Sequence, residues 1–325
     1  MDVIAGFIQR AILQGTPLLF GATGEIITEK SGNLNLGIPG IMYVGAISGV
    51  IGSFFYENYA NFIPIVGVLV AFLSSLIGSL LVTLIYCFLT ISLRANQNVT
   101  GLALTTFGVG LGNFFGGSLI KITKSSVPYI SLTDTGRAFK TALPFAKDLG
   151  WFGTLFFSYG FLVYLAIIIA VVAAIVLKRT RIGLHLRAVG ENPATADAAG
   201  INVTKYKYFA TCIGGMVAGL GGLFFIMDYS MGIWSNDGFG DRGWLAIAIV
   251  IFSIWRPNWC IFASYLFGGL YILYNFLNTS MRMQPIIQML PYVVTILALI
   301  LISVRKKREN QPPASLGLSY FREER

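Results

Sequence analysis

Long, uninterrupted runs of apolar residues are the feature that most constrains this chain. The run FLVYLAIIIAVVAAIVL at residues 161–177 is close to the length of about 20 residues with which a helix crosses a bilayer. Only 11% of the 325 residues are charged, against about 25% in soluble domains, so the chain cannot cover a water-facing surface. The long runs also argue against an outer-membrane barrel, whose strands have alternating polarity. We therefore predict a polytopic membrane protein rather than a soluble enzyme.

Nine apolar segments are candidates for membrane-spanning helices in an all-α bundle. They are residues 11–28, 36–56, 62–91, 98–120, 154–177, 205–227, 243–256, 258–279 and 285–304. The seventh has about 14 residues, too few to cross a bilayer upright, and so it is tilted, re-entrant or bounded elsewhere. We expect residues 1–304 to form the transmembrane domain. Residues 305–325 are polar and contain proline, which predicts a mobile tail.

The basic residues predict the orientation of this bundle. The loop at residues 178–204 and the tail are rich in Lys and Arg, which places both in the cytoplasm under the positive-inside rule. Alternation then puts the N-terminus outside and the C-terminus inside, with about 15 of the 23 Lys and Arg on the inner side. Five basic residues in the outer loop 121–153 weaken this asymmetry. The net charge of +9 thus indicates topology rather than nucleic-acid binding, because no soluble basic face is available.

Two breaks rich in Gly, Asn and Asp precede apolar runs. They are SGNLNLGIPG at residues 31–40 and SNDGFGDRG at residues 235–243, on opposite sides of the predicted topology, as in an inverted repeat whose interrupted helices flank a central site. Three glycines and Pro39 in the first break disfavour a regular helix. If it lies at membrane depth, it is packed in protein or lines a water-filled cavity, where Asn33 and Asn35 could hydrogen-bond a polar, uncharged ligand. The alternative is a tight interfacial loop.

The loop at residues 178–204 is far more polar than the segments around it. Its stretch ENPATADAAG predicts a short helix, with Asn192 as the N-cap, Pro193 at the first helical position and Gly200 at the end. An exposed helix of this kind could dock a soluble partner at the inner face. The alternative is a solvated, positively charged loop.

Few residues could support acid–base or metal chemistry. Glu25 lies near the inner end of the first segment and Asp228 past the end of the sixth, and the simplest role for Glu25 or Glu29 is an ion pair with Lys30. The single histidine, His185, and three dispersed cysteines do not match a catalytic triad or a metal site. We expect no catalytic residues and no metal.

Five motifs in order resemble the permease subunits of bacterial ABC importers. They are EKSGNLNLGIPGIMYVGA, LRAVGENPATADAAGINV, GDRGWLAIAIVIF, WRP and QMLPYVVTILALIL, and the resemblance covers about residues 15–304. The branch is the one related to branched-chain amino-acid and ribose permeases. Within it the chain is most similar to the nucleoside, or simple-sugar, permeases that work with basic-membrane-protein-type lipoproteins.

The resemblance implies a multi-pass importer subunit in the bacterial cytoplasmic membrane, surrounded by lipid. An extracytoplasmic binding lipoprotein delivers the solute, two permease subunits form the path, and two ATPase subunits drive alternating access. The second permease subunit is expected to be a paralogue. This chain has no GxxxxGK[ST] motif, so ATP and Mg²⁺ are bound by the partner ATPase and this chain binds no cofactor. The coupling helix that seats in the ATPase maps onto Arg187, Gly190, Glu191, Asn192, Asp197 and Gly200.

The motif SGNLNLG matches the family's interrupted helix beside the translocation path. We predict a path for a neutral, polar solute, lined by Asn33, Asn35, Asn98, Thr100, Phe107 and Trp244. The resemblance favours nucleosides. Many family members have Glu where this chain has Pro39, and this departure weakens the nucleoside interpretation against another sugar or small polar solute. An ion-coupled secondary carrier is the alternative from another class.

Overall fold

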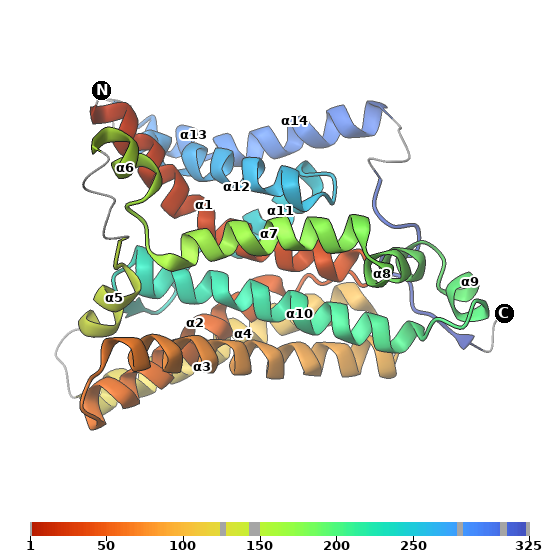
Figure 1. Cartoon of the computed structure of the whole chain (residues 1–325), viewed down its shortest axis with the longest axis horizontal. Helices are drawn as coiled ribbons and strands as arrows, with labels where there is room; N and C mark the ends of the chain where they lie inside the picture. Colours follow the sequence, from red (N-terminus) through yellow and green to blue (C-terminus); the bar gives the residue numbers. More distant parts are fainter. Residues whose placement is uncertain (1, 124–127, 143–149, 278–281, 306–310, 323–325) are drawn as a thin grey trace.

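Most of the chain is helical and lies along one common direction. A computed structural model describes residues 2–123, 128–142, 150–277, 282–305 and 311–322. The N-terminus and the C-terminus lie at opposite ends of the helical bundle (Figure 1). The prediction of a polytopic helical bundle is confirmed in this form.

Six helices among the described residues are long and apolar enough to cross a membrane. Two of them, α3 (Pro64–Cys87) and α10 (Val203–Phe224), are each extended by one π-helical turn, and these turns are η1 (Phe88–Ser92) and η3 (Phe225–Tyr229). These helices match the first six predicted segments. They are α1 (Asp2–Glu29), α2 (Ile38–Tyr59), α3 (Pro64–Cys87), α4 (Gln97–Thr123), α7 (Phe161–Arg179) and α10 (Val203–Phe224).

The last three predicted segments form shorter helices. These are α11 (Arg242–Phe252), α12 (Pro257–Ile272), the short η4 (Leu273–Asn275) and α13 (Gln284–Gln288), and finally α14 (Leu290–Arg305). At 1.5 Å per residue, α11 is about 16 Å long, roughly half the thickness of the hydrocarbon core. It ends in a tight turn in which Ile254 and Trp255 have φ values of 55° and 51°. The end of the predicted segment 258–279 lies outside the described residues.

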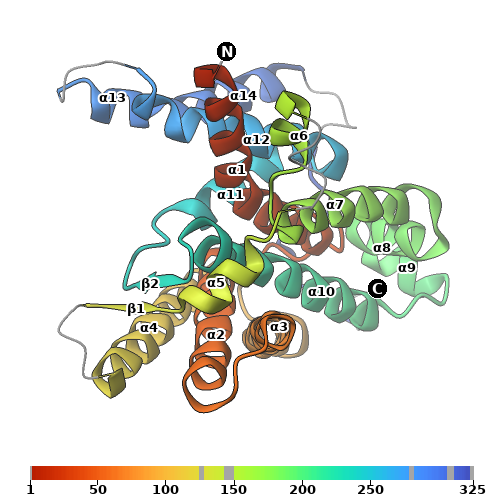
Figure 2. The ribbon, with the colours of Figure 1, turned by 60° about the vertical axis from the view of Figure 1, so that its left-hand side comes forward.

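Helices α1 and α10 form the centre of the bundle. α1 packs against α10 and α12, while α10 also packs against α2 and α3 (Figure 2). Glycines allow the backbones to approach: a Cβ atom on Gly24 would lie 2.2 Å from the carbonyl oxygen of Gly214, and one on Gly45 would lie 2.5 Å from the Cα of Gly219. Close packing through small residues is typical of membrane helices.

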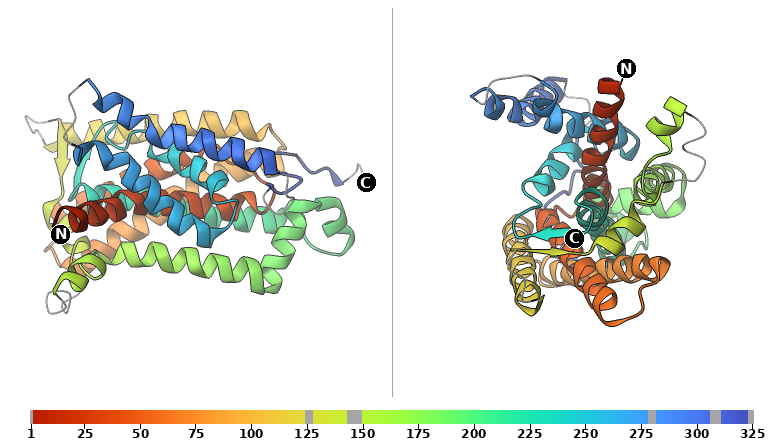
Figure 3. Two further views of the ribbon diagram at one scale, coloured as in Figure 1. Left: turned by 90° about the horizontal axis from the view of Figure 1, so that it is seen from above. Right: turned by 90° about the vertical axis from the view of Figure 1, so that its left-hand side faces the viewer.

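The two ends of the bundle carry different elements. One end has α5 (Thr133–Phe139), α6 (Gly150–Phe156) and a small antiparallel sheet of β1 (Tyr129–Ser131) and β2 (Ile233–Ser235) (Figure 3). The other end has α8 (Arg181–Glu191), α9 (Pro193–Ala198) and the tail (Figure 1). The sheet departs from the all-α prediction. It pairs Ile130 with Trp234, and both side chains are buried while their neighbours along each strand are exposed.

Candidate functional site

The chain between α1 and α2 is an irregular, buried segment. Residues 30–37, which we call the interrupted segment, lie inside the bundle, and Ser31, Asn33 and Asn35 are buried. α2 then begins at Ile38 with a proline in its first turn, where a missing N–H is tolerated. The predicted helix break is therefore present, and it is packed in protein.

Three side chains from two helices, α3 and α4, satisfy the backbone of the interrupted segment. The N–H of Leu34 donates to Gln97 Oε1 at 2.7 Å, and its carbonyl accepts from the Tyr86 hydroxyl at 2.5 Å. The carbonyl of Leu36 accepts from Thr105 Oγ1 at 2.8 Å. Unpaired backbone groups cost several kcal/mol in hydrocarbon, so these bonds hold the break open. Sequence reasoning missed all three side chains; their only signal was a polar group within or beside an apolar span.

Asn33 and Asn35, both predicted path residues, are only partly satisfied. Asn33 Nδ2 donates to Thr211 Oγ1 at 3.1 Å, and Asn35 Oδ1 accepts from the N–H of Gly37 at 2.9 Å. Asn33 Oδ1, Asn35 Nδ2 and Glu25 Oε2 have no hydrogen-bond partner within the described part of the chain. Buried, unpaired polar atoms are uncommon in native proteins and call for a specific role.

Glu25 and Glu29 are one helical turn apart at the end of α1, and both are buried. Glu25 Oε1 accepts from the backbone N–H of Asn35 at 3.0 Å, whereas Glu29 Oε2 accepts from the indole N–H of Trp255. The two carboxylates thus fasten the interrupted segment and the turn after α11 to α1. Burial lowers the pKa of the neighbouring Lys30, and nearby carboxylates partly offset this effect.

The two sequence breaks meet in space. A Cβ atom on Gly243, at the start of α11, would lie 2.5 Å from the Cα of Pro39, in the first turn of α2. The N-termini of α2 and α11 therefore converge, an arrangement found around substrate sites in transporters with interrupted helices. Pro39 is buried at this contact, where it serves packing.

The other predicted path residues lie on the surface of the chain. Asn98 is exposed and Thr100 is partly exposed near the start of α4. Phe107 of α4 is 49% exposed and Trp244 of α11 is 39% exposed. The structure brings Asn33 and Asn35 together in the interior and leaves these four on outer faces.

The predicted helix in the polar loop is α9, and its ends match the expected capping. Asn192 Oδ1 accepts from the N–H of Thr195 at 3.0 Å, and Pro193 occupies the first turn. Gly200 follows the helix with φ of 82°, a conformation that favours glycine. Arg187 is exposed on α8 and Gly190 is buried at its end.

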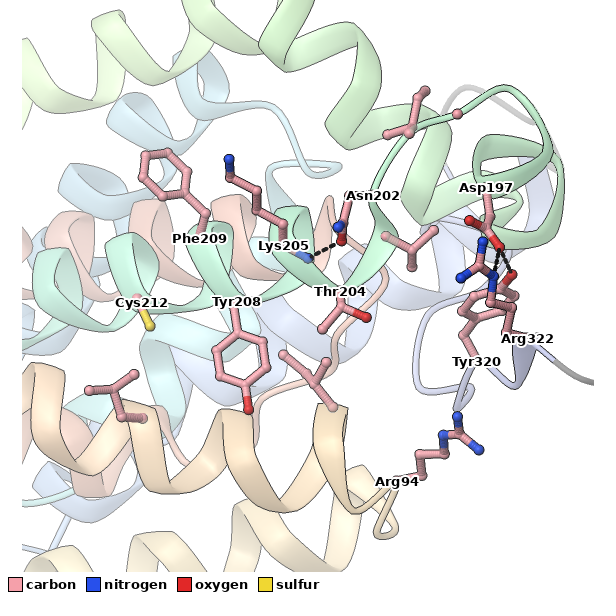
Figure 4. A pocket seen from close by; sticks show the side chains of 15 residues that line it. Arg94, Asp197, Asn202, Thr204, Lys205, Tyr208, Phe209, Cys212, Tyr320 and Arg322 are labelled. Carbon is pink, nitrogen blue, oxygen red and sulfur yellow. Dashed lines mark hydrogen bonds and ion pairs between the residues drawn. The ribbon is translucent and has the colours of Figure 1, made fainter.

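The acidic residues of this loop bind the chain's own tail. Asp197 Oδ2 accepts from the Tyr320 hydroxyl at 2.7 Å and pairs with Arg322 Nε at 3.2 Å (Figure 4). Glu191 Oε2 accepts from the N–H of Ala314 at 3.4 Å. In the structure the polar groups of residues 311–322, which we predict to be mobile, have partners at this end of the bundle. Residues 306–310 and 323–325 lie outside the described part of the chain.

A groove of about 890 Å³ opens between the tail, α9, α10 and the end of α3 (Figure 4). Arg94, Lys205 and Arg322 place positive charge around it. Tyr208 lines the groove, and its hydroxyl lies 2.6 Å from the hydroxyl of Ser92. An exposed capped helix beside a basic groove is a surface suited to a protein partner.

Comparison with known proteins agrees with this architecture. Residues 7–302 match the family described as branched-chain amino acid transport system / permease component. TsgC13 of Haloferax volcanii, named provisionally as a glucose ABC transporter permease protein, is 32% identical and covers 99% of both chains.

Two relatives carry nucleoside names. The nucleoside ABC transporter permease protein NupC of Lactococcus lactis is 31% identical over 90% of this chain and 91% of its own. The guanosine ABC transporter permease protein NupQ of Bacillus subtilis is 28% identical over 92% of each chain. With its membrane-spanning helices and broken central segment, the chain belongs to the branched-chain amino acid transport system / permease component family and is a multi-pass ABC transporter permease, a transport subunit rather than an enzyme.

Proposed function

We propose that this chain is one of two permease subunits of an ATP-driven importer that moves nucleosides across a bacterial cytoplasmic membrane. The observation that carries the proposal is the buried, interrupted segment with its uncharged amide groups. Asn33 Oδ1 and Asn35 Nδ2 offer one acceptor and one donor in the interior. Such groups match the hydrogen-bonding edge of a nucleobase or the hydroxyls of a sugar, and they do not require the solute to be charged.

A second permease subunit, most simply a paralogue, completes the path in this proposal. Phe107 and Trp244 are large aromatic side chains on outer faces of α4 and α11. A partner packed against these faces would enclose them, and Asn98 and Thr100 lie on the same helix as Phe107. Aromatic rings in such a path can stack on a nucleobase.

The orientation in this proposal is N-terminus out and C-terminus in, with nine segments in the membrane. The α8–α9 end carries Arg181, Arg187 and Lys205, which supports a cytoplasmic location. α9 then docks the ATPase subunits, which hold ATP and Mg²⁺, while this chain binds no cofactor. A substrate-binding lipoprotein approaches the opposite end, which has α5, α6 and the small sheet.

Another sugar is the second candidate solute. TsgC13, whose name refers to glucose, is 32% identical to this chain over nearly its full length. Pro39, where the sequence resemblance leads us to expect Glu, also weakens the nucleoside assignment. The two solutes share hydroxyl groups and neutrality, so the same amide groups serve either one.

Binding measurements separate these solutes. We expect the cognate binding protein to be stabilised in a thermal-shift panel by nucleosides and not by pentoses or hexoses alone. Replacing Asn35 by Ala should then reduce uptake in proteoliposomes more than the matched surface change Asn58→Ala, because Asn35 is fully buried in the break whereas Asn58 is exposed. A sugar response without any nucleoside response would refute the nucleoside assignment.

An ion-coupled carrier would need an ion gradient for uptake, whereas the proposed importer needs ATP. We expect uptake to require ATP and to survive collapse of the proton and sodium gradients. Glu25→Gln should retain uptake, because the amide oxygen can still accept from the Asn35 N–H. Loss of uptake on collapse of the gradients, with ATP present, would favour the carrier.

A further inference from the structure

The tail forms hydrogen bonds with two backbone carbonyl groups that lie far away in the sequence. Ser315 donates to the carbonyl of Gly190 through its backbone N–H at 3.0 Å and through its hydroxyl at 2.5 Å. The N–H of Gly317 donates to the carbonyl of Gly32 at 3.2 Å. The tail therefore contacts the end of α8 and the interrupted segment within three residues.

Farther along, the tail reaches α9. The Tyr320 hydroxyl donates to Asp197 at 2.7 Å, and Arg322 forms an ion pair with the same carboxylate. The Arg322 side chain is 74% exposed, and exposed ion pairs contribute little, so the tyrosine makes the stronger contact. Between these contacts, Phe321 stacks with Arg94, whose guanidinium lies 4.6 Å from the ring centre.

The junction requires glycine. A Cβ atom on Gly190 would lie 2.3 Å from the carbonyl oxygen of Lys30, and one on Gly32 would lie 2.7 Å from Ser315 Oγ. Gly32 and Gly317 also have φ values of 85° and 80°, which side-chain-bearing residues rarely adopt. Three backbone segments thus meet at a point where larger residues would separate them.

We propose that residues 311–322 form an intramolecular clasp that makes α9 and the interrupted segment move together. Ser315, Tyr320 and Asp197 are then positioning residues for energy coupling. This inference rests on the proposed function, in which α9 receives motion from the ATPase and the interrupted segment borders the path. The clasp supplies a direct link between the two, because Gly317 bonds to Gly32 of the interrupted segment, Ser315 bonds to the end of α8, and Tyr320 bonds to α9.

The first test measures coupling in the complete transporter. Ser315→Ala combined with Tyr320→Phe removes both hydroxyl donors with little change in volume. We expect the ATPase subunits to stay bound and ATP hydrolysis to continue, while solute moved per ATP falls at least about fivefold, the lower range of couplings between distant sites. Leu318→Ala is the matched control, because this side chain is 62% exposed. An unchanged ratio in the double variant overturns the clasp.

The second test restores the link chemically. A parent chain in which Cys87, Cys212 and Cys260 are replaced by Ser is first shown to transport, since Cys212 lines the same groove. Asp197→Cys with Tyr320→Cys is then introduced. We expect poor coupling in the reduced form and recovery after treatment with a short bifunctional thiol reagent. Poor recovery despite complete cross-linking overturns the clasp.

The two tests also separate the clasp from the proposed function. If the wild-type complex shows no ATP-driven uptake, the proposed function fails. The yield of cross-linking then still reports whether the tail lies against α9, and a low yield overturns the clasp on its own. If the wild type transports and the variants keep its ratio, only the clasp fails.

Discussion

Tyr86→Phe tests whether side chains from neighbouring helices hold the interrupted segment in place. The substitution keeps the aromatic ring and removes only the hydroxyl that donates to the carbonyl of Leu34 at 2.5 Å. Tyr86 is 0% exposed, so water cannot replace the lost donor from the surface. The carbonyl of Leu34 is then left without this partner inside the bundle.

The size of the effect follows from the burial of the carbonyl. A buried acceptor that loses its donor costs about 1–3 kcal/mol. At 1.36 kcal/mol per factor of ten, this corresponds to a roughly 5- to 150-fold increase in local opening of the segment. The neighbouring bonds from Gln97 and Thr105 remain, so we expect local opening rather than global unfolding.

Hydrogen exchange of the purified permease in nanodiscs measures this opening directly. Amides of residues 31–37 should exchange about 5- to 150-fold faster in Tyr86→Phe, with little change in α7. Tyr59→Phe is the matched control, because Tyr59 is 73% exposed. Equal exchange rates in the wild type and in Tyr86→Phe would refute the view that this hydroxyl holds the segment.

Three further predictions concern the α8–α9 end and Lys30, which lies next to it. Asn192→Ala removes the N-cap of α9 and should cost about 1 kcal/mol, weakening ATPase association in pull-down assays; unchanged association contradicts it. Gly190→Ala should lower the yield of folded protein on size exclusion, since its Cβ would collide with the carbonyl oxygen of Lys30, while Gly6→Ala should not. Burial lowers the pKa of Lys30 below 10.5, so the unfolded chain binds more protons and stability rises with pH in the window below 10.5; Lys30→Met should flatten this rise in thermal melts.

Local sequence was sufficient for the features that depend on neighbouring residues. The long apolar runs predict the six spanning helices, because helix formation in lipid follows from the need to satisfy the backbone internally. Asn192, Pro193 and Gly200 predict the ends of α9 through capping within a few residues. The break at Gly32–Gly37 is likewise visible in composition.

Contacts between distant segments could not be read in the same way. The tail is polar and contains proline, which favours mobility, but its partners are backbone carbonyls of Gly32 and Gly190. Every residue has a backbone carbonyl group, so the sequence does not indicate which one accepts a hydrogen bond from a distant segment. The same applies to Tyr86 and Gln97, whose partner is the backbone of Leu34.

The seventh segment shows a related limit. Residues 243–256 read as one apolar stretch, and the structure ends α11 at Phe252. Trp255 then adopts a left-handed conformation that is held by its bond to Glu29. A strained turn fixed by a tertiary contact leaves no pattern in hydropathy.

The buried carboxylates of α1 explain how a bundle with two breaks keeps its shape. Glu25 accepts from the N–H of Asn35, and Glu29 accepts from the indole of Trp255, so one helical turn of α1 holds the first break and the turn after α11. Buried carboxylates are costly in membranes, and hydrogen bonds to them offset part of that cost. α2 and α11 begin in contact at Pro39, so anchoring the chain before α2 and after α11 sets where their N-termini meet. The acids therefore have a positioning role at the candidate path, which their hydrogen bonds explain without proton transfer.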